Sequence, residues 1–582
     1  WQADFPGGNV SLEVEAPCES AASGLVRPFR LSVTSQAPVR LRLRLELPEA
    51  REPFPILPGF LFGDNNLAHV KTDDRFPHLT EPREDRPNFS PYWECRADRL
   101  SHPAALVAMQ GGAVALAIDP YTDGAEGAVG PGVEDGLRNG CFVQAPGTGR
   151  NAACGVTFGY RNDPACYVHK GAYAPATEHR LCCGEVRGSL HAVEGTDRLA
   201  VHRIVRDLYA RYRAERDPRL ETGEALRRLV RAMCGIGWSE ADQDFHDLRW
   251  DPADGQARTL RGPNHEISWT GGTETAYPLI VYGRRFGDED ALAKGRTLLD
   301  RIARPASINP KSGFFWDRVP AEGEPDNNGW WADMTGHQHC AYTNGQACYY
   351  LLEAARFEGE AAPPAWRETA LRVLDQALRA QAPDGNFGYT FTVEDGSIAD
   401  PEGFAGCWFV PALALAYAHT GEARYRDSAE RALAHYGEQV RRLEPYGTPM
   451  DTFGAIDQEG VLAFIRGARL WHETTGEAAF LDRLAEGAAY EYLWRYAYRA
   501  RAQEPPLRGS PWNSLGGSHT SVSNPCIHPM GLLVTSDLGY LARHTGDPYH
   551  ADRRADALAF VRNALSLYPD TMGYGEAGVL TE

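Results

Sequence analysis

The chain has 582 residues, of which 43% are hydrophobic and 24% are charged, which is ordinary for a globular protein but too long for one core. Its formal net charge is −19 and no basic patch stands out, so a nucleic-acid partner is not expected. No apolar run reaches the roughly 18 to 20 residues that cross a bilayer, so no membrane partner is expected either. Residues 1–5 show no signal-peptide pattern, which leaves the location as cytoplasmic or unknown.

The twelve cysteines contain no C-x-x-C pair, which excludes zinc-ribbon and thioredoxin-type sites. A chain of this size does not need disulfides to fold, so we expect free thiols, mostly buried.

Residues 8 to about 195 show the patterns of β-strands. Residues 39–47 alternate between apolar and polar, as in a half-buried strand. Residues 105–110 and 113–118 predict a hairpin that turns at Gly111 and Gly112. Strands of this kind and number favour a β-sandwich domain over residues 1–195.

One stretch of this half, residues 58–103, is long, polar, rich in aromatic residues and without a period. Loops of more than about 15 residues in compact domains are usually functional or disordered, and the aromatic content argues against disorder. We therefore expect this loop to reach the cleft of a second domain.

From about residue 197, apolar residues recur at spacings of three and four, which predicts helices. Glycines followed by an acidic residue, at 287, 359, 421, 476 and 546, separate apolar helices from amphipathic ones. The predicted helices are 197–213, 221–236, 273–286, 288–304, 338–357, 364–381, 405–420, 423–441, 457–474, 477–497, 527–544 and 547–566.

The twelve predicted helices make six pairs, which predict an (α/α)6 toroid with the apolar helices inside. We assign residues 221–582 to this barrel and 196–220 to a linker helix that belongs to it. A superhelical solenoid of helix pairs is the alternative architecture.

The connections that precede the inner helices are long and hold most of the tryptophans, histidines and acids, whereas the other turns are short. Long loops on one face of a rigid barrel form a cleft. Tryptophan faces can stack on the C–H faces of pyranose rings, and acids and amides bond sugar hydroxyls. The pattern therefore predicts a carbohydrate substrate.

In architecture, the chain resembles glycoside hydrolases that carry a β-sandwich before an (α/α)6 barrel, such as glucoamylase-like and disaccharide-phosphorylase-like enzymes. The mouth loops, for example residues 330–342, are loosely similar to those of unsaturated glucuronyl hydrolases and β-glucuronidases. The resemblance implies hydrolysis of a glycoside, but no catalytic residue can be aligned through it.

Asp333 is our first candidate for the general acid, because it follows two tryptophans and an apolar, aromatic setting would favour the protonated carboxyl. Asp451 and Glu402 compete for the second carboxylate. Each of the three also has a structural alternative as a helix cap or a partner of the helix dipole.

Other residues of the same loops are candidates for binding the substrate. They are Trp269, Glu274, Trp331, His337, His339, Tyr342, Trp408, Arg466, Trp512, His519 and His528. Arg466 would clamp the carboxylate of a uronic acid. His337 and His339 lack the spacing of a helical metal site, so neither a metal nor a cofactor is expected.

The predicted function is a glycoside hydrolase that acts on the end of an oligosaccharide or polysaccharide, with a uronic-acid-containing glycan as one option. A polysaccharide lyase that uses Tyr342 and His339 is one alternative. A sugar epimerase or isomerase and a non-catalytic glycan-binding repeat protein are the others. A broad sheet edge would be compatible with a homodimer.

Overall fold

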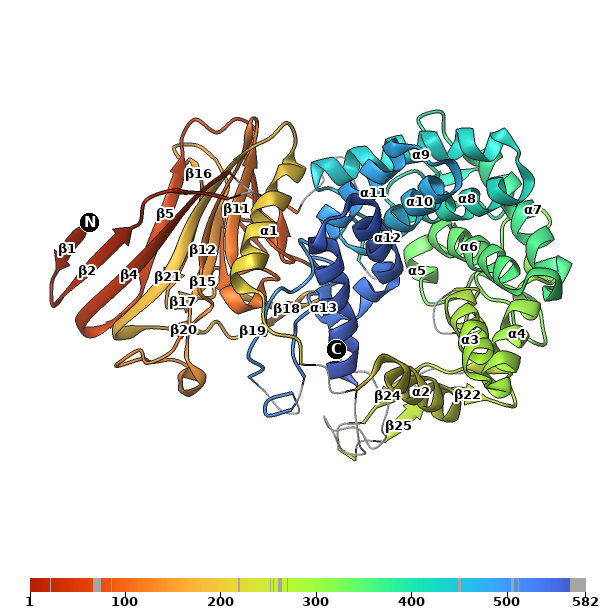
Figure 1. Ribbon diagram of the computed structural model, residues 1–582, viewed down its shortest axis with the longest axis horizontal. Coiled ribbons are helices and arrows are strands. Elements are labelled where there is room, and N and C mark those ends of the chain that lie inside the picture. Colours follow the sequence, from red (N-terminus) through yellow and green to blue (C-terminus); the bar gives the residue numbers. More distant parts are fainter. Residues whose placement is uncertain are drawn as a thin grey trace.

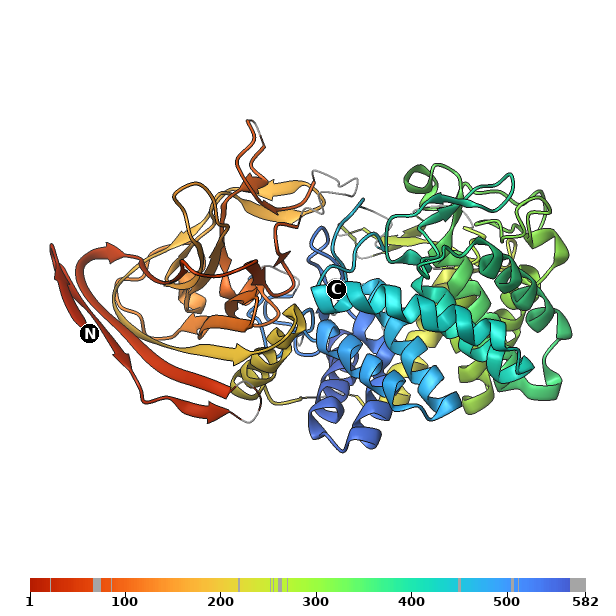
Figure 2. The same cartoon turned by 90° about the horizontal axis from the view of Figure 1, so that it is seen from above.

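The computed structural model describes the chain except residues 21, 23, 66–74, 85, 218–219, 252, 255, 260–263, 269–270, 449–451, 504–506, 511 and 566–582. The N-terminal part is built of strands and the C-terminal part mainly of helices, and the two lie side by side (Figures 1 and 2).

The larger sheet of the N-terminal half is antiparallel. Its strand order is β1 (Gln2–Phe5), β2 (Gly8–Val14), β4 (Gly24–Val39), β21 (Leu181–Glu194), β12 (Gly112–Ile118), β11 (Ala104–Met109), β6 (Phe54–Leu57) and β7 (Leu61–Phe62), and β3 (Cys18–Ser20) pairs with β4. The predicted hairpin is confirmed as β11 and β12, in which Met109 is paired with Gly112.

A second sheet packs against the first. Its order is β10 (Tyr92–Arg96), β15 (Gly140–Gln144), β16 (Ala152–Phe158) and β5 (Leu41–Leu47). Strands β15 and β16 contact β11 and β12, and buried side chains such as Leu106 and Val143 fill the core. The strand predicted over 39–47 is divided, because β4 ends at Val39 and β5 begins at Leu41, so the chain passes from one sheet to the other at Arg40.

Short strands complete the described β-structure. They are β8 (His78–Leu79), β9 (Phe89–Ser90), β13 (Tyr121–Thr122), β14 (Leu137–Arg138), β17 (Tyr160–Arg161), β18 (Cys166–His169), β19 (Ala172–Ala174), β20 (Glu178–His179), β22 (Trp238–Ser239), β23 (Asp244–Phe245), β24 (Leu248–Trp250), β25 (Ala257–Thr259), β26 (His339–Cys340), β27 (Thr390–Phe391), β28 (Ile398–Asp400), β29 (Ser518–His519) and β30 (Ile527–His528).

Each of the predicted helical segments contains a helix. The α-helices are α1 (Val201–Tyr212), α2 (Thr222–Ala232), α3 (Thr273–Phe286), α4 (Glu289–Ile302), α5 (Ala332–Thr335), α6 (Ala341–Glu358), α7 (Pro364–Ala380), α8 (Phe409–Thr420), α9 (Ala423–Arg442), α10 (Glu459–Thr475), α11 (Ala478–Glu491), α12 (Thr535–Thr545) and α13 (Pro548–Ala564). Only the short α5 was not predicted as a separate element. Gly287, Gly421, Gly476 and Gly546 end their helices in the left-handed conformation, as the glycine–acid turns predict.

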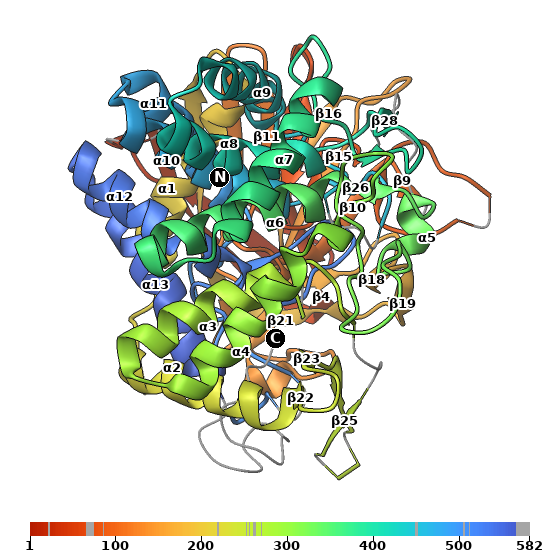
Figure 3. The same ribbon diagram turned by 90° about the vertical axis from the view of Figure 1, so that its right-hand side faces the viewer.

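Helical hairpins follow one another around a ring (Figures 1 and 3). They are α3–α4, α6–α7, α8–α9, α10–α11 and α12–α13. The first helix of each hairpin contacts that of the next, from α3 through α6, α8 and α10 to α12. These helices form the inner layer, and α6 is buried on nearly every face. Helix α2 contacts α13 beside α3 and completes the ring.

The predicted pair of 197–213 with 221–236 does not form. Helix α1 packs against β12 and β21, and its Arg206 and Tyr209 bond Asp547 and Asp556 of α13. Within the described residues α1 therefore lies between the sheet and the ring, away from α2 (Figure 1). The apolar periodicity of α1 is satisfied by the sheet, and a sequence pattern does not tell which surface a helix covers.

Residues of the 58–103 segment connect the two halves, and the described part of this predicted loop contains the strands β7 to β10. Tyr496 and Tyr498 donate hydrogen bonds to the carbonyls of Arg99 (2.8 Å) and Leu100 (2.7 Å), and Ser101 donates one to the carbonyl of Leu493 (2.6 Å). Phe62 stacks on Trp494 with ring centroids 4.6 Å apart. These contacts hold the described part of the loop against the helical half.

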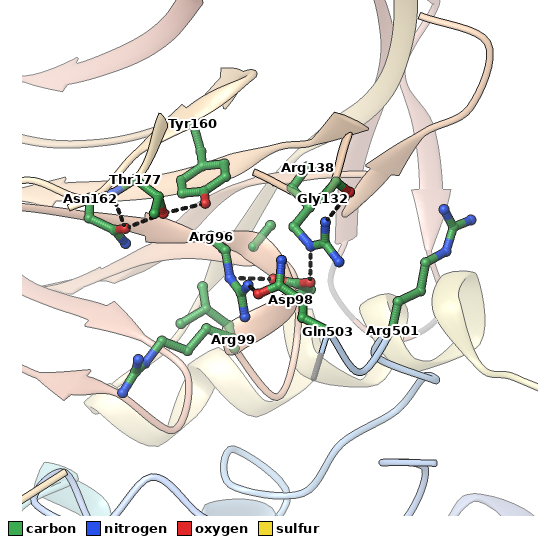
Figure 4. Close-up of polar contacts among 12 residues, drawn as sticks. Arg96, Asp98, Arg99, Gly132, Arg138, Tyr160, Asn162, Thr177, Arg501 and Gln503 are labelled. Carbon is green, nitrogen blue, oxygen red and sulfur yellow. Dashed lines mark hydrogen bonds and ion pairs between the residues drawn. The ribbon is translucent and has the colours of Figure 1, made fainter. Parts of the chain in front are cut away.

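A buried ion cluster lies beside this junction (Figure 4). The carboxylate of Asp98 pairs with Arg96 at 3.1 Å and with Arg138 at 3.2 Å. Gln503 of the helical half accepts a hydrogen bond from Arg96. The cluster therefore joins the smaller sheet to the segment that follows α11.

The twelve cysteines are all free, and half of them are buried, which confirms the expectation of free thiols. Among the described residues, no helix has the length and apolar character needed to cross a membrane.

Candidate functional site

The N-terminal ends of the inner helices bring together two carboxylates and a phenol. Glu274 lies in the first turn of α3, Tyr342 in the first turn of α6, and Glu459 is the first residue of α10. Burial, and then the negative charges of Glu274 and Glu459, raise the pKa of the Tyr342 phenol well above its ordinary value. All three side chains stand in first turns of inner helices, at the same end of the ring, although α3 and α10 are far apart in the sequence.

Aromatic rings surround Tyr342. Its ring centroid lies 6.4 Å from that of Trp331 and 5.9 Å from that of Trp408. Tyr342 and Trp408 are buried, whereas Trp331, Glu274 and Glu459 are partly exposed. Of these five residues, only Trp331, Glu274 and Glu459 therefore have exposed surface that a ligand could contact.

The helix dipoles favour this arrangement of charge. The N-terminal end of a helix carries partial positive charge, which stabilises a nearby carboxylate. Glu274 and Glu459 each occupy such an end, so each negative charge is stabilised by the dipole of its own helix. Among the described residues, no group of three or more His, Cys, Asp or Glu side chains could hold a metal ion.

A cavity of about 530 Å³ adjoins Glu274. Glu274 and His528 line it, together with apolar side chains of α2, of residues 529–533 and of α13. A ligand at the carboxylates would therefore meet an apolar surface on one side.

The three predicted catalytic residues are not among the side chains of this site. Two of them lie in other parts of the helical half, and the third lies outside the described residues. Asp333 is exposed on α5 rather than enclosed by aromatic rings. Glu402 accepts a hydrogen bond from Tyr446 at 2.6 Å and lines a different cavity, of about 450 Å³, beside α9. Asp451 and the predicted binding residue Trp269 lie outside the described residues.

Two predicted binding histidines are part of the core. The ring nitrogens of His339 contact Ser312 Oγ at 2.8 Å and the Asn327 amide nitrogen at 3.3 Å. His519 is buried with its Nε2 3.1 Å from the carbonyl oxygen of Arg99. Burial lowers the pKa of each imidazole to about 4. Both imidazoles are buried and contact protein groups, whereas His337 is exposed and His528 is partly exposed.

Arg466 is also structural. Its guanidinium pairs with the buried carboxylate of Asp537 at 2.9 Å and donates a hydrogen bond to Tyr349 at 2.8 Å. The guanidinium that was predicted to bind the carboxylate of a uronic acid is therefore paired with the carboxylate of Asp537 in α12.

Two tryptophans that were predicted to bind the substrate, Trp408 and Trp512, also pack against other side chains of the protein. Trp408 is only 1% exposed, so its ring supports Tyr342 instead of stacking on a sugar. Trp512 is partly buried, and its ring packs edge-on against Phe560 at 6.4 Å. Trp331 and Glu274 remain at the accessible site.

Glu459 is not among the candidates predicted from the sequence. The signal that could have identified it is its position, because Glu274 and Glu459 occupy the same first turn in two repeats of the ring. Equivalent positions of a repeat lie at the same end of a ring.

No protein-family model matches the chain, and no curated protein matches it. Solved structures with a similar trace include a sugar epimerase from a ruminal bacterium, at 11% identity over 62% of this chain and 90% of that one, with a TM-score of 0.41. A GH76 alpha-mannanase of Bacteroides thetaiotaomicron is 13% identical over 62% and 89%, with a TM-score of 0.41. An unsaturated glucuronyl hydrolase from Bacillus sp. GL1 is 16% identical over 62% and 86%, with a TM-score of 0.36.

By their names, these three are carbohydrate-active enzymes. One of them is an unsaturated glucuronyl hydrolase, a family to which the mouth loops show a loose resemblance. All three TM-scores are below 0.5.

Proposed function

We propose that the protein is a glycoside hydrolase and that Glu274 and Glu459 are its acid and base. The observation that carries the proposal is that these two carboxylates and Tyr342 all stand in first turns of inner helices, at one end of the helical ring. Glycoside hydrolysis commonly requires a pair of carboxyl groups on either side of the scissile bond. A partly exposed Trp331 beside them offers a face for a sugar ring.

In this scheme, one carboxylic acid protonates the glycosidic oxygen while the bond to the anomeric carbon breaks. The other carboxylate acts on the opposite side of the sugar, either on a water molecule or on the anomeric carbon itself. The phenol of Tyr342 is protonated near neutral pH, so it can act as a hydrogen-bond donor in the site.

The proposal names no particular sugar. Arg466 was the residue that favoured a uronic acid, and it is paired with Asp537. The Tyr342 and His339 pair of the lyase alternative also loses support, because the nitrogens of His339 are held by Ser312 and Asn327.

A panel of 4-nitrophenyl glycosides, including glucuronides, tests the proposal through the release of 4-nitrophenol. We expect Glu274→Gln and Glu459→Gln each to lower kcat by about 10²- to 10⁴-fold on whichever glycoside is cleaved, because general acid–base catalysis contributes that much. Glu289→Gln is the matched control, because Glu289 is an exposed first-turn acid of the outer helix α4 and should leave the rate unchanged.

Asp333→Asn belongs in the same series. If it abolishes hydrolysis while Glu459→Gln does not, the acid and base are assigned wrongly and Asp333 takes their place. A product that absorbs in the near ultraviolet without uptake of water would indicate a lyase and would contradict hydrolysis.

A further inference from the structure

The cavity beside Glu274 is bounded by α2, the start of α3, residues 528–535 and α13. Its walls are mostly aliphatic. The apolar lining side chains are Ala225, Leu226, Leu229, Pro529, Met530, Leu532, Leu533, Leu558 and Val561. Small-molecule sites typically have volumes of roughly 300 to 1,000 Å³, apolar walls and a few polar groups that fix the orientation of the ligand. This cavity, of about 530 Å³, has that composition.

The position of α1 explains why the cavity exists. In each hairpin of the ring, one helix covers the apolar face of the other. Helix α1, which precedes α2 in the chain, instead covers β12 and β21. The apolar side chains of α2 therefore line a cavity, and Leu226 is 40% exposed.

The cavity shares one residue with the proposed catalytic site. Glu274, in the first turn of the inner helix α3, lines the cavity and is one of the two proposed catalytic carboxylates. A ligand whose polar part lies at Glu274 can therefore extend its other part between α2 and α13.

We propose that this cavity binds an apolar aglycone, so that the substrate is an alkyl or aryl glycoside. This inference rests on the proposed function and extends it. Glu274 then stands where the sugar meets the leaving group, which is the position of the acid that protonates the glycosidic oxygen. The bond between the anomeric carbon and that oxygen breaks, the aglycone leaves as an alcohol or phenol, and water supplies the hydroxyl of the sugar.

Binding of the neutral apolar dye N-phenyl-1-naphthylamine tests the cavity without any sugar. We expect its fluorescence to rise on binding to one site. Leu229→Asn and Val561→Trp should each weaken the dye affinity about tenfold or more, the first by removing apolar surface and the second by filling the space. Leu371→Asn on the outer helix α7 is the matched control, because Leu371 is also partly buried but does not line the cavity.

A dye affinity that is unchanged in both Leu229→Asn and Val561→Trp would overturn the proposal. A chain that ends at Leu565 is a second control. If the dye binds only to this shortened chain, residues 566–582 occupy the cavity and the proposal is wrong.

The kinetic test uses methyl, butyl and octyl glycosides of the sugar found in the panel. We expect kcat/KM to rise with chain length in the wild type and to become nearly flat in Leu229→Asn. Hydrolysis that shows no dependence on chain length would refute the aglycone site while leaving the proposed function intact. Dye binding at the cavity without hydrolysis of any glycoside would instead refute the proposed function.

Discussion

Asp457 is a fully buried carboxyl group just before α10, and it makes stability depend on pH. Its oxygens accept hydrogen bonds from the amides of Thr448 at 2.9 Å and Gly460 at 3.3 Å. Burial nevertheless raises the pKa of Asp457 from 3.8 to about 8. Between these two values the folded protein binds more protons at this site than the unfolded chain, so the stability contributed by this group falls as the pH rises.

Asp457→Asn removes this titration and keeps an oxygen that can accept the Thr448 bond. We expect the melting temperature of Asp457→Asn, relative to wild type, to be higher at about pH 8 than at about pH 5. Thermal unfolding at several pH values measures this. Asp395→Asn is the control, because hydrogen bonds lower the pKa of the exposed Asp395 to about 2, and its effect should not change across this range. A constant difference for Asp457→Asn would contradict the prediction.

For single residues, the sequence was less informative than for loops. It indicated which loops hold the candidate site, but not which of their side chains line it. Glu274 and Trp331 were identified because they stand beside the starts of inner helices. The partners of Arg466 and His339, Asp537 and Ser312, could not be foreseen, because they lie in other elements of the chain. No local pattern reveals such pairing.

Two glycines of the α3–α4 hairpin illustrate different constraints on one element. A Cβ on Gly295 would lie 2.6 Å from the carbonyl oxygen of Ala276, so the backbones of α3 and α4 would have to separate. A Cβ on Gly287 would meet no atom within 4 Å, but the residue has a φ of +69°. The first glycine allows close helix packing, and the second allows the turn.

We expect Gly287→Ala to lower the free energy of unfolding by about 1 kcal/mol, the cost of a left-handed residue, without a change in activity. Gly295→Ala should cost about 2 to 3 kcal/mol, because it overpacks a close helix contact. It should also slow hydrolysis, since α3 carries Glu274. Urea denaturation and rate measurements on both variants test these expectations. Equal losses of stability in Gly287→Ala and Gly295→Ala would contradict the different roles of the two glycines.

The helices themselves were largely predictable from the chain, because caps and periodicity are local. Segments such as 273–286 and 364–381 match α3 and α7 to within a residue. The pairing of α1 was not predictable in this way. An amphipathic helix buries its apolar face equally well against a sheet or another helix, and here the sheet is its partner.

For the whole molecule, the junction of the two halves makes them a single stable unit. Trp494, which follows α11, is fully buried and stacks on Phe62 of β7 at 4.6 Å. The hydrogen bonds of Tyr496 and Tyr498 to residues 99 and 100 lie beside it. Apolar burial and satisfied polar groups at one junction oppose separate unfolding of the halves.

We therefore expect one calorimetric transition for the wild-type protein. Trp494→Ala removes a large aromatic ring from the junction, at a cost of about 3 to 5 kcal/mol, and should split this transition into two. Trp471→Ala is the matched control, because Trp471 is equally buried but lies inside the ring, against Tyr417 and Phe480. It should lower the stability without splitting the transition. Two transitions in the wild type, or splitting by Trp471→Ala alone, would show that the junction does not couple the halves.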